Sequence, residues 1–238
     1  MNIALIFAGG TGSRMNTKSR PKQFLELHGK PIIIYTLEKF ENHNMIDGII
    51  VVCLKSWISF LEKILKKYNI KKVVSVIHGG VTGQESIYNG LCEVERLYPS
   101  DSLVLIHDGV RPLIDEDTIT ENITCAQQNG NAITVAPAIE TITIRENKNE
   151  VGKIIDRSKC QLAKAPQTFI LKDIISVHRR SKKDNYTQAI DSASLVSHYG
   201  FRLYTVVGSN ENIKITTPAD FFMFRAFMDA KENSQIFC

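Results

Sequence analysis

A glycine-rich segment near the start of the chain combines residue types that suit phosphate binding. It reads AGGTGSRM, residues 8–15, and directly follows an apolar run at Ile3 to Phe7. Glycines let a backbone come close to a ligand, and backbone N–H groups at a helix start bind phosphate. The spacing matches neither the dinucleotide fingerprint G-x-G-x-x-G nor the Walker pattern G-x-x-x-x-G-K-[ST]. Arg14 and Lys22 follow the turn with charges that suit phosphate oxygens, although an exposed loop with incidental positive charge is the alternative.

A second segment, HDGVRP at residues 107–112, follows another apolar run. Asp108 at a strand end can hold a ligand hydroxyl or a metal, and Arg111 can hold a phosphate or carboxylate. An ion pair between the two that closes a turn is the simpler alternative. We interpret His107 as a packed residue and not as a base, because no serine or cysteine nucleophile is placed beside it.

Two more segments offer polar groups. In GGVTGQES, residues 79–86, Gly80 permits close backbone approach, and Ser86 can contact a ligand, cap the following helix, or do both. In NIKITTP, Lys214 is flanked by Ile213 and Ile215, so a strand alternation would point it towards solvent or a cleft. The acidic run at 115–117 is better explained as a helix start than as a metal site.

The elements that must position these residues alternate between strands and helices. Buried strands are predicted at Ile3–Phe7, Gly48–Leu54, Val73–Ile77, Leu103–Ile106 and Ile133–Ala136, and helices at Pro31–Phe40, Trp57–Tyr68, Glu85–Tyr98 and Asp117–Gln128. This alternation predicts an α/β fold with a mostly parallel sheet flanked by helices. Ligands of such sheets bind beyond the carboxyl ends of the strands, where the three loops would converge.

The second half of the chain departs from this alternation. Residues 138–157 predict two short strands around a polar turn at 146–149, either as a dimer arm or as a flap on the same domain. Helices are expected near Leu171 and Asp191, a strand at Arg202–Val207, and a last helix from Pro218. The chain, residues 1–238, is expected to form one domain with this β-arm.

The composition is that of a folded, water-soluble protein. The chain is 43% hydrophobic with a net charge of +4, and no basic block predicts nucleic-acid binding. Its five cysteines show no paired spacing, which argues against a zinc site or a disulfide framework. The absence of a leader pattern and of long apolar runs predicts a cytoplasmic protein without a membrane partner.

Five segments in this order, AGGTGSRM, PKQF, HDGVRP, APQTF and NIKITTP, resemble the methylerythritol-phosphate and ribitol-phosphate cytidylyltransferase family from Ile3 to about Phe227. The resemblance implies a Rossmann-like nucleotidyltransferase fold with a β-hairpin dimerisation arm. It also implies CTP as substrate, Mg²⁺ as the divalent metal, pyrophosphate as a product and a homodimer. The expected product is a CDP-polyol made from a polyol phosphate of ribitol or glycerol type, or else from 2-C-methyl-D-erythritol 4-phosphate.

The resemblance also assigns roles to residues. The loop matching Ala8, Gly9, Gly10, Thr11, Gly12, Ser13 and Arg14 would wrap CTP, with Gly80 and Ser86 helping to select cytosine. Arg14 and Lys22 would hold the triphosphate, and Lys214 would lie at the reacting phosphate. Asp108 and Arg111 would lie near nucleotide and acceptor, with Asp108 also the candidate metal ligand. From the arm, Thr141 and Arg157 would bind the acceptor of the neighbouring subunit.

Three positions depart from the family pattern. Ala165 and Ile190 stand where methylerythritol-phosphate enzymes usually carry threonines, and Gly83 where an arginine is common. LAKAPQ also differs from the usual ribitol-branch run. Because lost hydroxyls change which acceptor a site prefers, we expect a polyol phosphate such as ribitol or glycerol phosphate rather than methylerythritol phosphate. A nucleotide-sugar glycosyltransferase and a non-catalytic nucleotide-binding protein are the alternatives from other classes.

Overall fold

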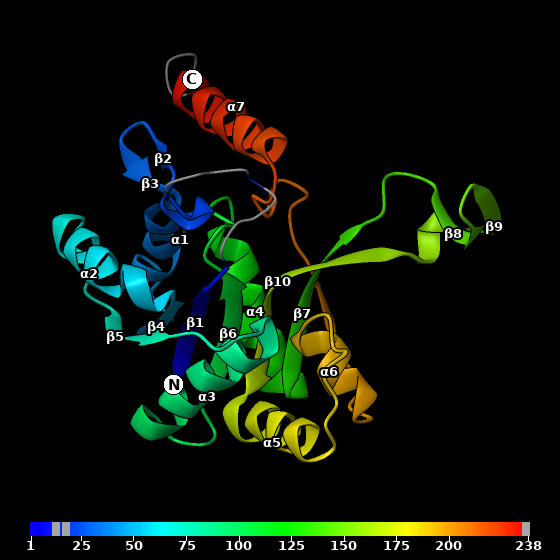
Figure 1. Cartoon of the computed structure of the whole chain (residues 1–238), viewed down its shortest axis with the longest axis horizontal. Helices are drawn as coiled ribbons and strands as arrows, with labels where there is room; N and C mark the ends of the chain where they lie inside the picture. The colour runs from blue at the N-terminus through cyan, green and yellow to red at the C-terminus, as the bar shows by residue number, and fades with distance from the viewer. Residues whose placement is uncertain (11–14, 16–19, 235–238) are drawn as a thin grey trace.

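The computed structural model describes residues 1–10, 15 and 20–234. Its centre is a seven-stranded sheet in the order β11-β7-β10-β6-β1-β4-β5 (Figure 1). The strands are β1 (Asn2–Ala8), β4 (Gly48–Cys53), β5 (Val73–His78), β6 (Leu103–Asp108), β7 (Asn131–Pro137), β10 (Gln161–Ile170) and β11 (Thr205–Val207). The five predicted strands are confirmed to within about two residues at each end.

The sheet is mostly parallel, as predicted, with one inserted strand. β1 pairs in parallel with β4 and β6, and β4 with β5. β10 runs antiparallel between β6 and β7, and Gln167 on β10 pairs with Ile106 on β6. This register places the residues just before Gln167 beside the carboxyl end of β6. β10 was not predicted from the sequence, because its first residues are exposed without a regular apolar alternation and it contains Pro166.

Helices cover both faces of the sheet (Figure 1). They are α1 (Ile32–Glu41), α2 (Ile58–Lys67), α3 (Gly83–Leu97), α4 (Glu116–Asn129), α5 (Leu171–Lys183), α6 (Ser192–His198) and α7 (Pro218–Ser234). The chain also forms short 3₁₀ turns, η2 (Lys22–Phe24), η3 (Lys55–Trp57) and η4 (Arg157–Lys159), and a small ribbon of β2 (Glu26–Leu27) and β3 (Lys30–Pro31). The acidic run at 115–117 starts α4 as predicted, since Asp115 accepts the Thr118 N–H at 2.7 Å.

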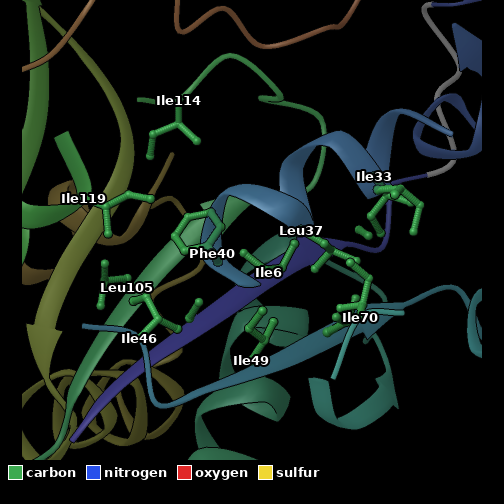
Figure 2. Packing of buried hydrophobic residues seen from close by; sticks show 14 of the residues in the cluster. Ile6, Ile33, Leu37, Phe40, Ile46, Ile49, Ile70, Leu105, Ile114 and Ile119 are labelled. Atoms are coloured by element: carbon green, nitrogen blue, oxygen red, sulfur yellow. The ribbon is translucent and has the colours of Figure 1, made fainter. Parts of the chain in front are cut away.

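Alternation along β1 directs its side chains into two hydrophobic clusters, one on each face of the sheet. On β1, Ala4 and Ile6 face the cluster covered by α1, α2 and α4, whereas Ile3 and Leu5 face the cluster covered by α3, α5 and α6. Figure 2 shows Leu37 and Phe40 of α1 close to Ile6 in the first cluster. Because both faces are covered, the middle strands are apolar without interruption, which is why they were recognisable in the sequence.

The predicted hairpin is present as an arm. β8 (Ile142–Asn147) and β9 (Glu150–Ile155) form their own two-stranded sheet, and the hairpin projects from the body in Figure 1. Most of its residues are exposed, among them Ile144 and Val151, at 53% and 59%. A two-stranded ribbon of this kind has little stability of its own, so the exposed apolar side chains matter for what the arm does.

Two expectations about the last third of the chain were wrong in detail. The strand predicted from Arg202 is confined to β11, and the NIKITTP segment is not a strand. Its backbone instead forms hydrogen bonds with a loop and with α7: Ile215 N–H donates to Val110 O, and the Thr216 and Thr217 N–H groups donate to the Asp220 carboxylate in the first turn of α7. Within the described residues, no helix is long and apolar enough to span a membrane.

Candidate active site

A cavity of about 410 Å³ opens at the carboxyl ends of β1 and β6. Phe7 and Asp108 come from these strand ends, Thr82 and Gly83 from the start of α3, and Ala165 from β10. Further wall residues precede or begin α6, and Lys214 comes from the loop before α7. The position agrees with the edge predicted from the parallel strands.

Asp108 joins two cations at this cavity. Arg111 Nε donates to Asp108 Oδ2 at 2.8 Å, and Lys214 Nζ donates to Asp108 Oδ1 at 2.6 Å. The turn Asp108–Arg111 is closed by a backbone bond from Arg111 N–H to Asp108 O. The ion pair predicted as the simpler alternative is therefore present, and it lies in the cavity wall.

The charges of this network fix the protonation state of Asp108. Burial alone would raise the pKa of the Asp108 carboxyl, but the charges and hydrogen bonds of Lys214 and Arg111 outweigh burial and hold that pKa well below its usual range. Asp108 is thus a permanent anion at neutral pH. Two cations share one carboxylate, which leaves this end of the cavity positively charged and suited to a phosphate.

His107 is structural, as the sequence analysis inferred. Its ring is 1% exposed, lies 5.1 Å from the Phe40 ring and shares a hydrogen bond of 3.2 Å with Arg111 O. Burial lowers the pKa of His107 to about 4, so the ring is neutral at pH 7. Its contact with Arg111 O supports the turn that carries Arg111.

Asn212 and Lys164 belong to the site and were not recognised from the sequence. Asn212 O accepts from Arg111 Nη1 at 2.8 Å and from Lys164 Nζ at 3.4 Å, while Asn212 Nδ2 donates to Ala165 O at 2.7 Å. One buried asparagine therefore joins β10, the turn after β6 and the loop that carries Lys214. The motif NIKITTP contained this signal, but the partner strand β10 had not been predicted.

The two glycine loops meet at Ser86. A Cβ on Gly9 would lie 3.7 Å from Ser86 Oγ, and one on Gly79 would lie only 2.8 Å from it. Ser86 Oγ accepts from Gly80 N–H at 2.9 Å and donates to Thr82 O at 2.8 Å. Ser86 therefore does not cap α3 as considered above; Thr82 is the cap, accepting from the Glu85 N–H at 3.1 Å. The reason is that α3 begins at Gly83, two residues earlier than predicted.

The segment PKQF, residues 21–24, fixes the start of the first glycine loop. Gln23 is buried, and its Nε2 donates to Ala8 O at 2.7 Å and to Gly10 O at 3.3 Å. Lys22 Nζ donates to Ile215 O at 2.9 Å, beside the loop that carries Lys214. The loop start, Lys22 and the Lys214 loop are therefore held close together. The predicted ligands Thr11, Gly12, Ser13 and Arg14 lie outside the described residues.

The predicted acceptor ligands of the arm are not brought to this cavity. Thr141 and Arg157 are exposed, neither is among the described residues that line the cavity, and Arg157 Nη1 donates to Ile139 O at 2.8 Å. The three positions that depart from the family pattern behave differently, because Gly83, Ala165 and Ile190 all line the cavity. These three departures from the family pattern therefore lie where the cavity would determine which ligand binds.

Asp108 is poorly placed to be the main ligand of a metal, because both of its oxygens already bind cations. In the described part of the chain, the one group of three ligand-type side chains is His28, Asp229 and Glu232, in the β2–β3 turn and on α7. That group shares no residue with the cavity. At this site, the described residues alone do not form a protein cage for a metal.

Comparisons with known proteins show the family of the chain. The family model described as IspD, 2-C-methyl-D-erythritol 4-phosphate cytidylyltransferase, matches residues 2–230. The chain is 55% identical over 237 residues to a ribitol-5-phosphate cytidylyltransferase of Vibrio parahaemolyticus, covering 100% of both. It is 38% identical to a 2-C-methyl-D-erythritol 4-phosphate cytidylyltransferase of Clostridium acetobutylicum, over 98% of this chain and 99% of that one.

A solved structure shows the same architecture. The crystal structure of 4-diphosphocytidyl-2C-methyl-D-erythritol synthase from Anaerococcus prevotii superposes with a TM-score of 0.82 at 27% identity, covering 96% of each chain. The chain therefore belongs to the IspD family of cytidylyltransferases.

Proposed function

We propose that this enzyme transfers CMP from CTP to the phosphate of ribitol 5-phosphate, giving CDP-ribitol and pyrophosphate. The observation that carries the proposal is the cavity itself: its cations, Arg111 and Lys214, suit an anionic acceptor, and Ala165 and Ile190 depart from the methylerythritol pattern. The similarity to a ribitol-5-phosphate cytidylyltransferase over the whole chain supports the same acceptor.

The reaction needs no general base from the protein. A phosphate monoester has its second pKa near ~6, so it is mostly a dianion at neutral pH and attacks the α-phosphorus of CTP directly. The bond from the α-phosphorus to the bridging oxygen breaks, and pyrophosphate leaves with that electron pair. The protein must align the two anions and reduce their repulsion, which is work for fixed cations.

Each of the candidate cations can be given a role in this reaction. Lys214 is half-exposed at the cavity and anchored to Asp108, and we infer that its ammonium would lie beside the reacting phosphates. Lys22, which donates to Ile215 O, would approach the triphosphate from the side of the glycine loop. Arg14, by its position in the family pattern, completes this set. Gly80 and Ser86 stand at the loop junction where the cytosine base would be recognised.

We expect Mg²⁺ to bind together with CTP, as a complex with its phosphates. Mg²⁺ keeps several waters and is usually bound through substrate phosphates and one or two carboxylates. With Asp108 occupied by Arg111 and Lys214, the phosphate oxygens of CTP are the main ligands that we expect. The bound ion would reduce the negative charge of the triphosphate, and no protein residue is assigned to it as a sole ligand.

The arm supports a homodimer. Its apolar side chains Ile144, Val151 and Ile154 are 53%, 59% and 66% exposed, and burying them on a second subunit would be favourable. Thr141 and Arg157 lie away from their own cavity, as expected if they complete the site of the neighbouring subunit. We further propose that the enzyme acts in the cytoplasm, where CTP is made.

2-C-Methyl-D-erythritol 4-phosphate is the second candidate acceptor. The family model carries that name, and the Anaerococcus structure shares the fold. The two acceptors have the same number of carbons but differ in branching and in the number of hydroxyls, so a direct comparison separates them. Against this acceptor stands the loss of both threonine hydroxyls at Ala165 and Ile190.

The deciding experiment is pyrophosphate release from CTP and Mg²⁺ with a panel of acceptors. Ribitol, arabinitol, glycerol and methylerythritol phosphates would be compared, with UTP and ATP as nucleotide controls. We expect release with ribitol 5-phosphate and CTP. Release with methylerythritol phosphate alone would replace the proposed acceptor, and no release with any acceptor in the panel would reject the proposal.

A further inference from the structure

Lys164 is a positively charged residue of the cavity wall that has no assigned role in the proposed reaction. It lies on β10 immediately before Ala165, is half-buried, and lines the cavity together with Asp108, Arg111 and Lys214. Its Nζ donates to two backbone carbonyls, Asn210 O at 2.9 Å and Asn212 O at 3.4 Å. These two bonds hold the ammonium in place at the cavity wall.

The charge of Lys164 is not neutralised by a carboxylate. Within the described residues it forms no ion pair, whereas Arg111 and Lys214 share Asp108. Asp191, a second carboxylate of the cavity wall, is engaged elsewhere by Gln167 Nε2 and Ser194 N–H. The end of the cavity around Asp108 therefore holds three cations and one carboxylate.

Lys164 and Arg111 are kept close to each other without an anion between them. Both donate to the same carbonyl, Asn212 O. Burial, and then the charge of Arg111, lower the pKa of Lys164. Two like charges held by one carbonyl at a half-buried site are unfavourable alone and become favourable when an anion binds between them.

The order of strands indicates which anion this is. β6 lies between β1 and β10, so Asp108 has the nucleotide loop that follows β1 on one side and Lys164 on the other. Lys164 is therefore on the side away from Gly9 and Gly10. Two of the positions expected near the acceptor, Ala165 and Ile190, line the same cavity.

We propose that Lys164 binds the phosphate of the acceptor, as the third cation beside Arg111 and Lys214. The proposal rests on the proposed function, because it assumes an acceptor that carries a phosphate monoester. Lys164 would bind the dianion in the ground state and hold its oxygens towards the α-phosphorus of CTP. The next residue, Ala165, offers no hydroxyl to the acceptor. The charge of Lys164 would supply recognition in place of that missing hydroxyl.

The simpler explanation is that Lys164 only ties β10 to the loop at residues 209–212. Two variants distinguish the explanations: Lys164→Gln keeps an amide that can donate to the carbonyls but removes the charge, and Lys164→Arg keeps the charge. Lys159→Gln, at an exposed lysine of η4, is the matched control. Each variant would be assayed for the KM of ribitol 5-phosphate and the KM of CTP, with the unfolding temperature measured in parallel.

We expect Lys164→Gln to raise the KM for the acceptor about 10- to 100-fold, the range for a lost charge-assisted hydrogen bond. The KM for CTP and the unfolding temperature should change little, and Lys164→Arg should stay within a few-fold of the parent. An unchanged acceptor KM would overturn the proposal. An equal rise in both KM values with a lower unfolding temperature would also overturn it, in favour of the structural tie.

A binding measurement keeps the test independent of turnover. Inorganic phosphate would be titrated into the CTP-free protein and its Lys164→Gln variant, with binding followed by calorimetry. We expect weaker phosphate binding in the variant, and equal binding would overturn the role of Lys164. Failure of the parent enzyme to release pyrophosphate with every acceptor in the panel would instead reject the proposed function, so the two failures are distinguishable.

Discussion

Asp108 shows how one carboxylate can be both a structural and a functional residue. Its two oxygens bind Arg111 and Lys214, which come from a turn after β6 and from the loop before α7. The same contacts that close the turn also aim two donors at the cavity. A sequence pattern that reads as an ion pair is therefore compatible with a binding site when the pair stands at the carboxyl edge of a parallel sheet.

Replacement of Lys214 by methionine should separate catalysis from folding. Lys214→Met keeps much of the side-chain volume and leaves the Asp108–Arg111 pair intact. We expect kcat to fall by about 100-fold or more, as for other single charge-stabilising groups. Pyrophosphate release measures kcat, and circular dichroism checks the fold. Lys63→Met, at an exposed lysine of α2, should keep full activity, and a comparable loss there would contradict a specific role for Lys214.

At the residue scale, the sequence indicated the site only in part. Asp108, Arg111 and Lys214 were identified because each stands in a segment with an unusual composition next to an apolar run. Lys164 and Asn212 were not, because the role of each depends on contacts across about 50 to 100 residues of chain, from Asn212 to Lys164 and from Asn212 to Arg111. These contacts depend on where β10 runs in the folded sheet, and the spacing of residues within one short segment does not reveal them.

Gln167 connects the element β10 to the helix that closes the cavity. Its Nε2 donates to Asp191 Oδ2 at 2.7 Å, and its Oε1 accepts from Ala193 N–H at 2.8 Å. Asp191 is in turn the N-cap of α6, bound to the Ser194 N–H at 2.8 Å. One buried amide therefore fixes the cavity wall formed by residues 189–192 relative to the sheet.

Gln167→Leu should loosen that wall. Removing both hydrogen bonds leaves the Asp191 carboxylate and the Ala193 N–H without this partner, at a cost of about 2 kcal/mol in unfolding free energy. The KM for the acceptor should rise with it, because Ile190 and Ser192 line the cavity. Urea denaturation measures the first effect and steady-state kinetics the second. Gln161→Leu, at an exposed position on the same strand, is the control, and an equal loss there would refute this role.

The arm can be tested by mixing two inactive variants. Arg157→Ala should remove an acceptor ligand on the arm, and Lys214→Ala should disable the cavity. If the arm serves the neighbouring subunit, a mixed dimer has one complete site, and equal mixing after unfolding and refolding should restore about one quarter of parent activity. This follows because half of the dimers are mixed and each has one of two sites. No recovery in the mixture would show that the arm serves its own chain.

At the element scale, prediction succeeded where burial was uniform. The strands β1, β4 and β6 are buried on both faces, so their sequences are continuous apolar runs. β10 changes along its length from exposed residues at the arm to buried residues in the sheet, and no single period describes it. The hairpin of β8 and β9 was predictable from its alternation and polar turn, whereas the side that it packs against was not.

At the scale of the whole molecule, the buried histidines His107 and His178 make stability depend on pH. His107 lies between Phe40 and the turn after β6, and His178 on α5 is stacked 6.1 Å from the Tyr88 ring. Burial is the largest cause that lowers the pKa of each to about 4, from an ordinary value of 6.5. Neither ring can take up a proton at pH 5 to 6 as readily as it would in the unfolded chain.

The sign of the effect follows from the direction of the shift. Between pH 6.5 and about 4 the unfolded chain binds protons that the native protein does not, so the stability present above pH 6.5 is lost as the pH falls. At pH 5 each histidine should cost about 2 kcal/mol of unfolding free energy relative to pH 7. Both histidines act on the global unfolding equilibrium, because they lie in the cores on opposite faces of the sheet.

His178→Phe isolates one of these contributions. The substitution keeps an aromatic ring against Tyr88 and removes the titrating group, whose two nitrogens have no hydrogen-bond partner within the described structure. We expect the loss of unfolding free energy between pH 7 and pH 5 to shrink by about 2 kcal/mol relative to the parent. Urea denaturation at the two pH values measures it, with His78→Gln, at an exposed histidine of β5, as the control. An unchanged pH dependence in His178→Phe would mean that the native protein protonates this ring without unfolding.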